Sequence, residues 1–283
     1  MPSYENLVIG LGLTGCGVGS GAAIRLYCQS LHKRYHVLFL FLSFGVTRAF
    51  ILLVFSLPSL TKALNVPHPR GVYAWIWVLT EPVLWFFYVG IVLELYSLVL
   101  ANYKGLQTVG RWAFLIAMAL AVLISGLSVL LTSSHHNETA VVIFYYALID
   151  RGIMFTLVLF ILLILFFLSW YPIKLSRNLI IHAIICTVFL ISLSMGYLVR
   201  NVQGTAVTHA VNIANLGITI ACWGAWMLLL TREGEGTRMV VRREWTPEEE
   251  KRLVDQLTAI NSSLLRATGK KKDKDAEIRQ NRN

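Results

Sequence analysis

The sequence predicts an all-α fold: a polytopic membrane protein with a bundle of seven transmembrane helices and a short tail. Of the 283 residues, 56% are hydrophobic and 14% are charged, whereas a soluble domain carries about 25% charged residues. Residues 1–231 are long apolar runs with short polar links, and residues 232–283 are polar and rich in charge. Runs that cross a membrane must be helical, because lipid offers no partner to free backbone groups.

Seven apolar runs are long enough to cross a bilayer, whose hydrocarbon core needs about 20 residues of helix. We expect transmembrane helices at Leu7–Cys28, Tyr35–Leu57, Tyr73–Leu100, Trp112–Leu131, Ala140–Trp170, Leu179–Tyr197 and Ala210–Leu230. This division makes residues 1–231 one membrane domain and residues 232–283 a tail. Of the two, the membrane domain carries most of the basic excess, with 12 Lys and Arg against 5 Asp and Glu.

The basic residues of the links predict the orientation, because cytoplasmic loops carry an excess of Lys and Arg. One side has Lys33, Arg34, Lys104, Arg111, Lys174 and Arg177, whereas the other has Lys62, Arg70 and Arg200. We therefore expect the N-terminus outside and the basic tail in the cytoplasm. The net charge of +10 is spread over short loops. That spread suits contact with anionic lipid headgroups and argues against nucleic-acid binding, which favours one concentrated basic patch.

The first apolar run is rich in glycine and admits two interpretations. Gly10, Gly12 and Gly15 match the spacing of a dinucleotide-binding loop, but no βαβ unit follows and residues 6–80 contain no Asp or Glu. Such a site needs both. Gly15 with Gly19, and Gly17 with Gly21, also form the GxxxG spacing that lets helices approach closely in lipid. We predict helix packing here.

Polar side chains inside the predicted spans carry the functional signal. A charge near the bilayer centre costs about 2.5–3.5 kcal/mol on insertion scales, so it normally finds a partner or water. With a rise of about 1.5 Å per residue, Arg48, Glu81 and Asp150 lie roughly 12–14 Å below the outer surface. The candidate ligand-binding residues in that half of the membrane are Arg48, Glu81, Tyr146, Asp150, Arg151, Asn212 and Asn215.

This polar set has two interpretations that the sequence leaves open. One is an outward-facing pocket for a ligand or solute. The other is a group of internal salt bridges, Arg48 with Glu81 foremost, that only hold helices together; the four charges of the set sum to zero, which suits this second interpretation. Near the inner surface, we expect Arg25 and Glu94 to form a structural pair.

The tail contains one predicted helix, at about 246–267. Thr246 and Glu249 form a capping box, Pro247 suits the first turn, and the helix is expected to end near Thr268. Four apolar side chains repeat on one face of it: Leu253, Leu257, Ile260 and Leu264. We expect this candidate partner-binding face to contact a partner helix, to self-associate, to lie on the membrane, or to pack under the bundle.

No enzymatic motif appears in the sequence. There is no serine-nucleophile motif, HExxH or phosphate-binding loop. The four cysteines have no metal-site spacing, and the histidines lie mostly in loops or at helix ends. We expect no metal, no haem or other cofactor, and no catalytic residue.

Three stretches resemble an uncharacterised group of bacterial seven-helix integral membrane proteins that has no assigned activity. They are LTEPVLWFFYVGIVLELYSLVL, ILFFLSWYPIKLSRN and LLTREGEG. The resemblance covers most of the chain and implies an inner (plasma) membrane location. Two better-known groups do not fit. Microbial rhodopsins hold retinal on a lysine of the seventh helix, and residues 210–230 contain none; Asp150-Arg151-Gly152 lies in the wrong helix for the motif of G-protein-coupled receptors.

The sequence favours a receptor- or sensor-like protein. It would bind a small ligand or partner in its outer half and pass the state through its tail to a cytoplasmic protein. A small-solute transporter or channel is the first alternative, with the intramembrane charges along its path. A structural or assembly subunit of a membrane complex, with every buried charge paired, is the second.

Overall fold

The structure is a computed structural model that describes residues 2–57, 61–62, 68–132, 138–203, 207–240 and 246–280. Within these ranges, seven helices are long and apolar enough to cross a membrane. They are α1 (Pro2–Cys28), α2 (His36–Ser56), α4 (Pro69–Val99), α5 (Lys104–Thr132), α6 (Glu138–Trp170), α7 (Arg177–Gln203) and α8 (Thr208–Leu229). Each overlaps a predicted span. The prediction of an all-α seven-helix bundle is confirmed, and the chain is a multi-pass integral membrane protein.

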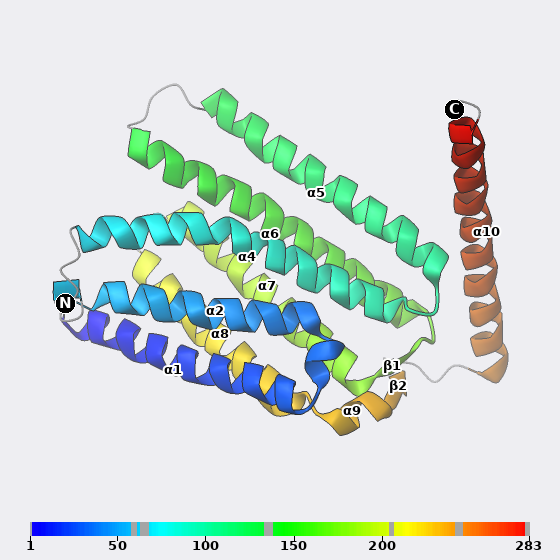
Figure 1. Ribbon diagram of the computed structural model, residues 1–283, viewed down its shortest axis with the longest axis horizontal. Coiled ribbons are helices and arrows are strands. Elements are labelled where there is room, and N and C mark those ends of the chain that lie inside the picture. Colours follow the sequence, from blue (N-terminus) through cyan, green and yellow to red (C-terminus); the bar gives the residue numbers. More distant parts are fainter. Residues whose placement is uncertain are drawn as a thin grey trace.

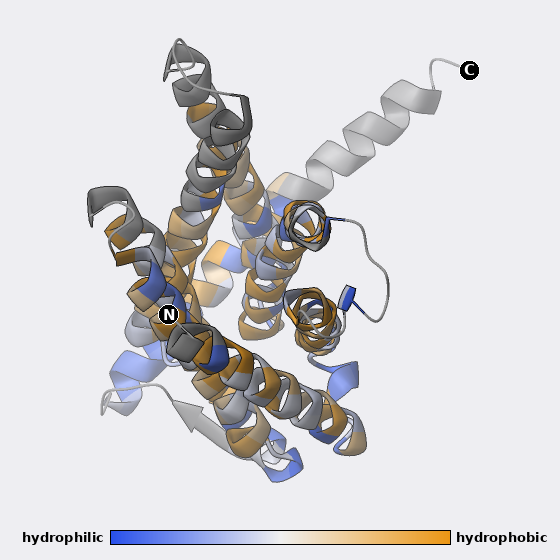
Figure 2. Cartoon of the chain, turned by 90° about the vertical axis from the view of Figure 1, so that its left-hand side faces the viewer, coloured by the Kyte–Doolittle hydropathy of each residue, from blue (hydrophilic) through white to orange (hydrophobic). Residues whose placement is uncertain are grey.

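Six of these helices form a ring, and α5 lies outside it (Figure 1). Helix α1 packs between α2 and α8, α4 between α2 and α6, and α7 between α6 and α8. Helix α5 packs chiefly on α6, where the rings of Phe114 and Phe160 have centroids 4.4 Å apart. Figure 2 shows hydrophobic residues along the helices and hydrophilic stretches mainly in the segments that connect them, as expected for a bundle surrounded by lipid.

The glycines of α1 allow the close approach that the GxxxG spacing predicted. A Cβ at Gly19 would lie 2.5 Å from Cε3 of Trp223 on α8 and 2.6 Å from Cγ2 of Val46 on α2. A Cβ at Gly21 would lie 2.9 Å from Sδ of Met227, while one at Gly17 would meet no atom within 4 Å. The prediction of helix packing is therefore confirmed at Gly19 and Gly21 and does not apply to Gly17.

Short elements that were not predicted follow the membrane helices at the end of the bundle opposite the N-terminus. We call this the tail end. They are η1 (Leu31–Lys33), β1 (Lys174–Ser176), α9 (Arg232–Gly236) and β2 (Arg238–Val240). Strand β1 pairs antiparallel with β2, with Leu175 opposite Met239. The first part of the expected tail is therefore packed on the membrane domain.

The last helix, α10 (Pro247–Gln280), lies across the tail end (Figure 1). The capping box is confirmed: the backbone N–H of Thr246 donates to Oε2 of Glu249 at 3.2 Å, and that of Glu249 donates to Oγ1 of Thr246 at 3.4 Å. The expected end at residue 267 is corrected, since the helix continues to Gln280. One glycine costs only about 1 kcal/mol in a helix, and the residues after Gly269 are mostly good helix formers.

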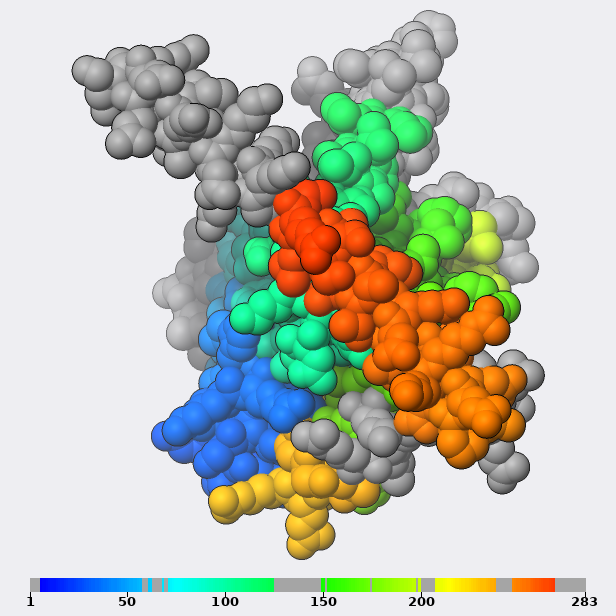
Figure 3. All heavy atoms as spheres, turned by 90° about the vertical axis from the view of Figure 1, so that its right-hand side faces the viewer, coloured from blue at the N-terminus to red at the C-terminus, as the bar shows by residue number. Residues whose placement is uncertain are grey.

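Helix α10 is docked on the start of α5 (Figure 3). Leu257 is 2% exposed, and Oδ1 of Asn261 accepts a hydrogen bond from the backbone N–H of Gly105 at 2.8 Å. Leu253 and Leu264 are half-buried, whereas Ile260 remains 44% exposed. Most of the predicted partner-binding face thus packs under the bundle of its own chain.

Candidate functional site

An ion pair between α2 and α4 is the centre of the candidate site. Nη2 of Arg48 donates to Oε2 of Glu81 at 2.5 Å, and Nε of Arg48 donates to Oγ1 of Thr80 at 2.8 Å. Arg48 lies eight residues before the end of α2, which is about 12 Å along the axis. The Arg48–Glu81 pair that the second interpretation of the polar set named is therefore present, toward the end of the bundle where α1 begins.

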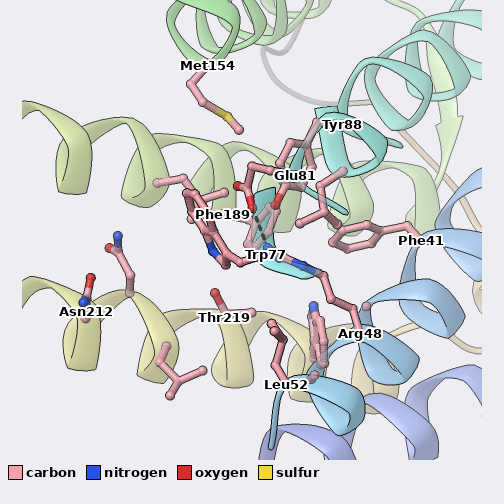
Figure 4. Close-up of a pocket in the computed structure, with 17 residues that line it drawn as sticks. Phe41, Arg48, Leu52, Trp77, Glu81, Tyr88, Met154, Phe189, Asn212 and Thr219 are labelled. Atoms are coloured by element: carbon pink, nitrogen blue, oxygen red, sulfur yellow. Dashed lines mark hydrogen bonds and ion pairs between the residues drawn. The ribbon is translucent and has the colours of Figure 1, made fainter. Parts of the chain in front are cut away.

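A cavity of about 510 Å³ lies beside this pair (Figure 4). Its volume falls within the range of about 300–1,000 Å³ that small-molecule sites occupy. Helices α2, α4, α6, α7 and α8 all contribute to its wall, which includes Arg48, Glu81 and Thr219. Five aromatic side chains also line it: Phe41, Trp77, Tyr88, Phe189 and Trp223. The cavity is thus largely apolar, with a few polar groups, as ligand sites usually are.

Aromatic rings close the cavity toward the tail end. The centroid of the Phe41 ring lies 5.7 Å from that of Tyr88, 5.9 Å from that of Phe189 and 6.4 Å from that of Trp223. Phe41 is seven residues nearer the tail end than Arg48, or about 10 Å along the axis. Rings at these separations interlock favourably, so they form a packed floor below the ion pair.

The structure brings together four of the seven predicted ligand-binding residues. Asn212 and Asn215 of α8 line the cavity together with Arg48 and Glu81. Asp150 is 3% exposed and is not among the described lining residues; its Oδ1 accepts a hydrogen bond from Nε1 of Trp85 at 2.7 Å. The side chains of the other two, Tyr146 and Arg151, lie outside the described residues.

Sequence reasoning missed the apolar part of the site. Trp77, Leu84 and Tyr88 line the cavity on the same face of α4 as Glu81. Their spacing of four, three and four residues is helical, so this face was visible in the sequence. Aromatic residues are common throughout the spans, however, and only the position of a neighbouring helix distinguishes a cavity wall from a face that contacts lipid.

The expected partner of Glu94 has to be corrected. Glu94 accepts hydrogen bonds from the backbone N–H groups of Val37 at 3.0 Å and Leu38 at 3.3 Å, and it pairs with Nδ1 of His36 at 2.9 Å. The first N–H groups of a helix have no partner within it and attract negative charge. Helix α4 packs directly on α2, so Glu94 caps the start of α2. It forms no ion pair with Arg25 among the described residues.

A second polar cluster lies at the tail end, and we call it the latch: Arg34, Tyr35, Asn178, Thr231 and Glu235. Glu235 pairs with Nη1 of Arg34 at 2.9 Å and accepts from the Tyr35 hydroxyl at 2.5 Å. The Asn178 amide donates to Glu235 at 3.0 Å and to the carbonyl of Thr231 at 2.7 Å. These bonds join α9 to α7 and to the two residues between η1 and α2, so the latch is a structural connection.

The latch also explains a glycine within LLTREGEG. A Cβ at Gly234 would collide with the Asn178 amide, which is fully buried. Two of the stretches that carried the sequence resemblance, 164–178 and 229–236, therefore meet at this point. The third, 79–100, supplies both Glu81 and Glu94.

No metal site is found in the described part of the chain, where no three His, Cys, Asp or Glu side chains gather. Compared with protein-family models, with curated proteins and with solved structures, the chain matches none. Functional inference therefore depends on the geometry of the cavity.

Proposed function

We propose that this membrane protein is receptor- or sensor-like and binds a small ligand in the cavity beside Arg48. One observation carries the proposal. The Arg48 guanidinium is held by bonds from Nε to Thr80 and from Nη2 to Glu81, while its Nη1 donates to no described residue. Guanidinium carries five N–H donors in a fixed fork, so Nη1 is a positioned donor in the wall of a cavity.

The cavity indicates the chemistry of the ligand. A group that accepts hydrogen bonds, such as a phosphate, a carboxylate or a carbonyl, fits Nη1 of Arg48, and charge-assisted bonds of this kind are the strong ones. The amides of Asn212 and Asn215 add polar contacts from α8. The Trp77 ring offers an apolar surface, and Trp223, 7% exposed, adds only a small part of the wall. A ligand with one acceptor group and an apolar body uses all of these features.

The direction of the response follows from the predicted orientation. With the basic loops in the cytoplasm, the cavity lies in the outer half of the membrane and the latch at the inner surface. Helices α9 and α10 dock on α7 and α5, so a shift of the bundle helices reaches the tail, where we place the cytoplasmic partner. The bacterial inner membrane as its location rests on the sequence resemblance alone.

The test is ligand binding to the purified full-length protein in lipid nanodiscs. Phosphate- and carboxylate-bearing metabolites are screened by thermal shift, and hits are repeated with the double variant Arg48→Met/Glu81→Gln. Removing both charges avoids a buried unpaired carboxylate. We expect affinity to fall at least about tenfold, or 1.4 kcal/mol. Arg34→Met, at the latch, is the control and leaves affinity unchanged. Equal affinity in the double variant would contradict the proposal.

A transporter is the second candidate function, favoured by the aromatic floor. The rings of Phe41 and Phe189 lie between the cavity and the latch, which is at the tail end of the same helices. This is the arrangement expected of a path closed at one point. Flux of the bound compound into proteoliposomes, abolished by Arg48→Met/Glu81→Gln, distinguishes a transporter from a receptor. If the unmodified protein binds none of the screened compounds and the double variant still folds, the remaining alternative, an assembly subunit, is favoured.

A further inference from the structure

A second cavity, which we call the groove, lies along the lipid-facing seam between α7 and α8. It has a volume of about 500 Å³, and its lining includes Val188, Ile191 and Met195. These three side chains are 50%, 42% and 55% exposed, so the groove opens toward the surrounding hydrocarbon. It lies in the same half of the membrane as the first cavity, because Gly196 and Asn215 are each seven residues, or about 10 Å, from the ends of their helices.

Asn215 lines both the groove and the cavity beside Arg48. It packs on Gly196, where any Cβ would collide with its amide. The amide forms no hydrogen bond with a described residue, in contrast to the other polar lining residue, Ser192, whose hydroxyl donates to the carbonyl of Phe189 at 2.7 Å. A polar group in lipid costs several kcal/mol when it has no partner. The Asn215 amide, on the seam between two cavities, can therefore form hydrogen bonds with a ligand.

We infer that the ligand of the cavity is a single-chain amphiphile of the membrane, whose phosphate head binds Arg48 and whose hydrocarbon chain lies in the groove. This inference rests on the proposed function and specifies its ligand. The two cavities share Asn215 and lie at one depth on opposite sides of the α7–α8 seam. The contact of Asn215 with Gly196 closes this seam, so a single molecule spans both cavities only when the Asn215 side chain turns away from Gly196. The head-to-chain junction, with its ester or hydroxyl oxygens, supplies hydrogen bonds to the amide.

The chemistry of each part fits its place. The groove faces the hydrocarbon core of the bilayer, which consists mainly of acyl chains, and an acyl chain suits its apolar lining. A phosphate oxygen suits Nη1 of Arg48, which can donate a charge-assisted hydrogen bond to it while Nε and Nη2 stay bonded to Thr80 and Glu81. Ordinary bilayer lipids also contact such grooves, but they do not place a head group in the cavity beside Arg48. The inference therefore requires that binding depend on both ends of one molecule.

The experiment uses the full-length protein in phosphatidylcholine nanodiscs with a lysophosphatidic acid that carries a diazirine midway along its chain. Cross-linked peptides are mapped by mass spectrometry, and glycerol 3-phosphate serves as the head-only probe. We expect saturable cross-links within 188–199 and 211–218. Ala214→Leu fills the groove from its exposed side and should lower cross-linking at least tenfold. Ile184→Leu, on the lipid-facing surface of α7 outside the groove, should leave it unchanged.

The outcomes separate the two levels of the proposal. Cross-linking that is not saturable, or that Ala214→Leu leaves unchanged, overturns the amphiphile even if glycerol 3-phosphate still binds through Arg48. The amphiphile is also overturned if saturable cross-linking is unchanged in Arg48→Met/Glu81→Gln, because the phosphate head then binds elsewhere. If glycerol 3-phosphate, the lysolipid and the screened metabolites all bind independently of Arg48, the proposed function itself fails.

Discussion

Trp85 on α4 donates a hydrogen bond from its indole Nε1 to Oδ1 of Asp150 on α6, with 2.7 Å between the two atoms. The bond joins two helices of the ring, and Asp150 is almost completely buried. A carboxylate in this position needs hydrogen-bond donors, since an isolated charge in an apolar environment is very costly. The sequence left open whether Asp150 binds a ligand or is a structural charge; in the structure its carboxylate is hydrogen-bonded to Trp85 of α4, one of the helices that form the cavity wall.

Trp85→Phe should destabilise the protein. The substitution keeps an aromatic ring but removes a donor to a buried carboxylate, and a lost bond of this kind costs about 1–3 kcal/mol. Thermal unfolding in detergent measures the effect. Trp75→Phe is the matched control, because Trp75 is 67% exposed, and it should leave the unfolding temperature within error. Equal stability of both variants would mean that Asp150 does not depend on Trp85.

Gly19→Ala should destabilise the protein, whereas Gly17→Ala on the same helix should not. The new Cβ at position 19 would overlap Trp223 and Val46, and overpacking of this kind costs about 1–3 kcal/mol. The new Cβ at position 17 meets nothing within 4 Å, so the higher helix propensity of alanine makes that variant neutral or slightly stabilising. Unfolding of both proteins in parallel checks the prediction, and equal destabilisation would contradict the packing of α1.

The sequence was sufficient to predict the fold and part of the site, because the spans and the depths of the polar residues depend only on position along a helix axis. Hydrophobic length defines a span, and residue count defines the depth of Arg48, Glu81 and Asn215. It was insufficient wherever a contact depends on which helices are neighbours and on their rotation. Arg25 and Glu94 share a depth, but α4 faces the start of α2, so Glu94 caps α2. For the same reason, the groove and the latch were not foreseen.

Because of the latch, the stability of the protein should fall at alkaline pH. Burial and the Glu235 carboxylate raise the pKa of Tyr35 above its ordinary value. A raised pKa means that the protonated hydroxyl is the stabilising form, so its contribution is complete below about pH 10 and is lost as the pH rises further. Tyr35→Phe should cost about 1 kcal/mol at neutral pH, and this difference should shrink above about pH 10.

Thermal unfolding of both proteins between about pH 8 and pH 11 checks this prediction. Tyr27→Phe serves as the control, because Tyr27 is 63% exposed, and its curve should parallel that of the unmodified protein. A constant difference between Tyr35→Phe and the unmodified protein across the whole range would show that the Tyr35 hydroxyl is not the group that titrates.

Leu257→Ala should release α10 from the bundle, whereas Ile260→Ala should not. Leu257 is 2% exposed beside α5, and truncation of a buried leucine costs about 2–5 kcal/mol. Ile260, on the same helix, is 44% exposed. Hydrogen exchange of the amides in residues 247–267 measures the docking, and we expect faster exchange only in Leu257→Ala.

The same pair of variants tests the role assigned to the tail. A relay through α10 requires that the helix move with the bundle, so Leu257→Ala should uncouple ligand binding from any response of the tail. Binding at Arg48 should be unchanged, because the two sites lie at opposite ends of the helices. If Ile260→Ala instead abolishes a partner interaction while docking persists, the exposed edge of α10 is the partner surface. Identical exchange in both variants would contradict the docking itself.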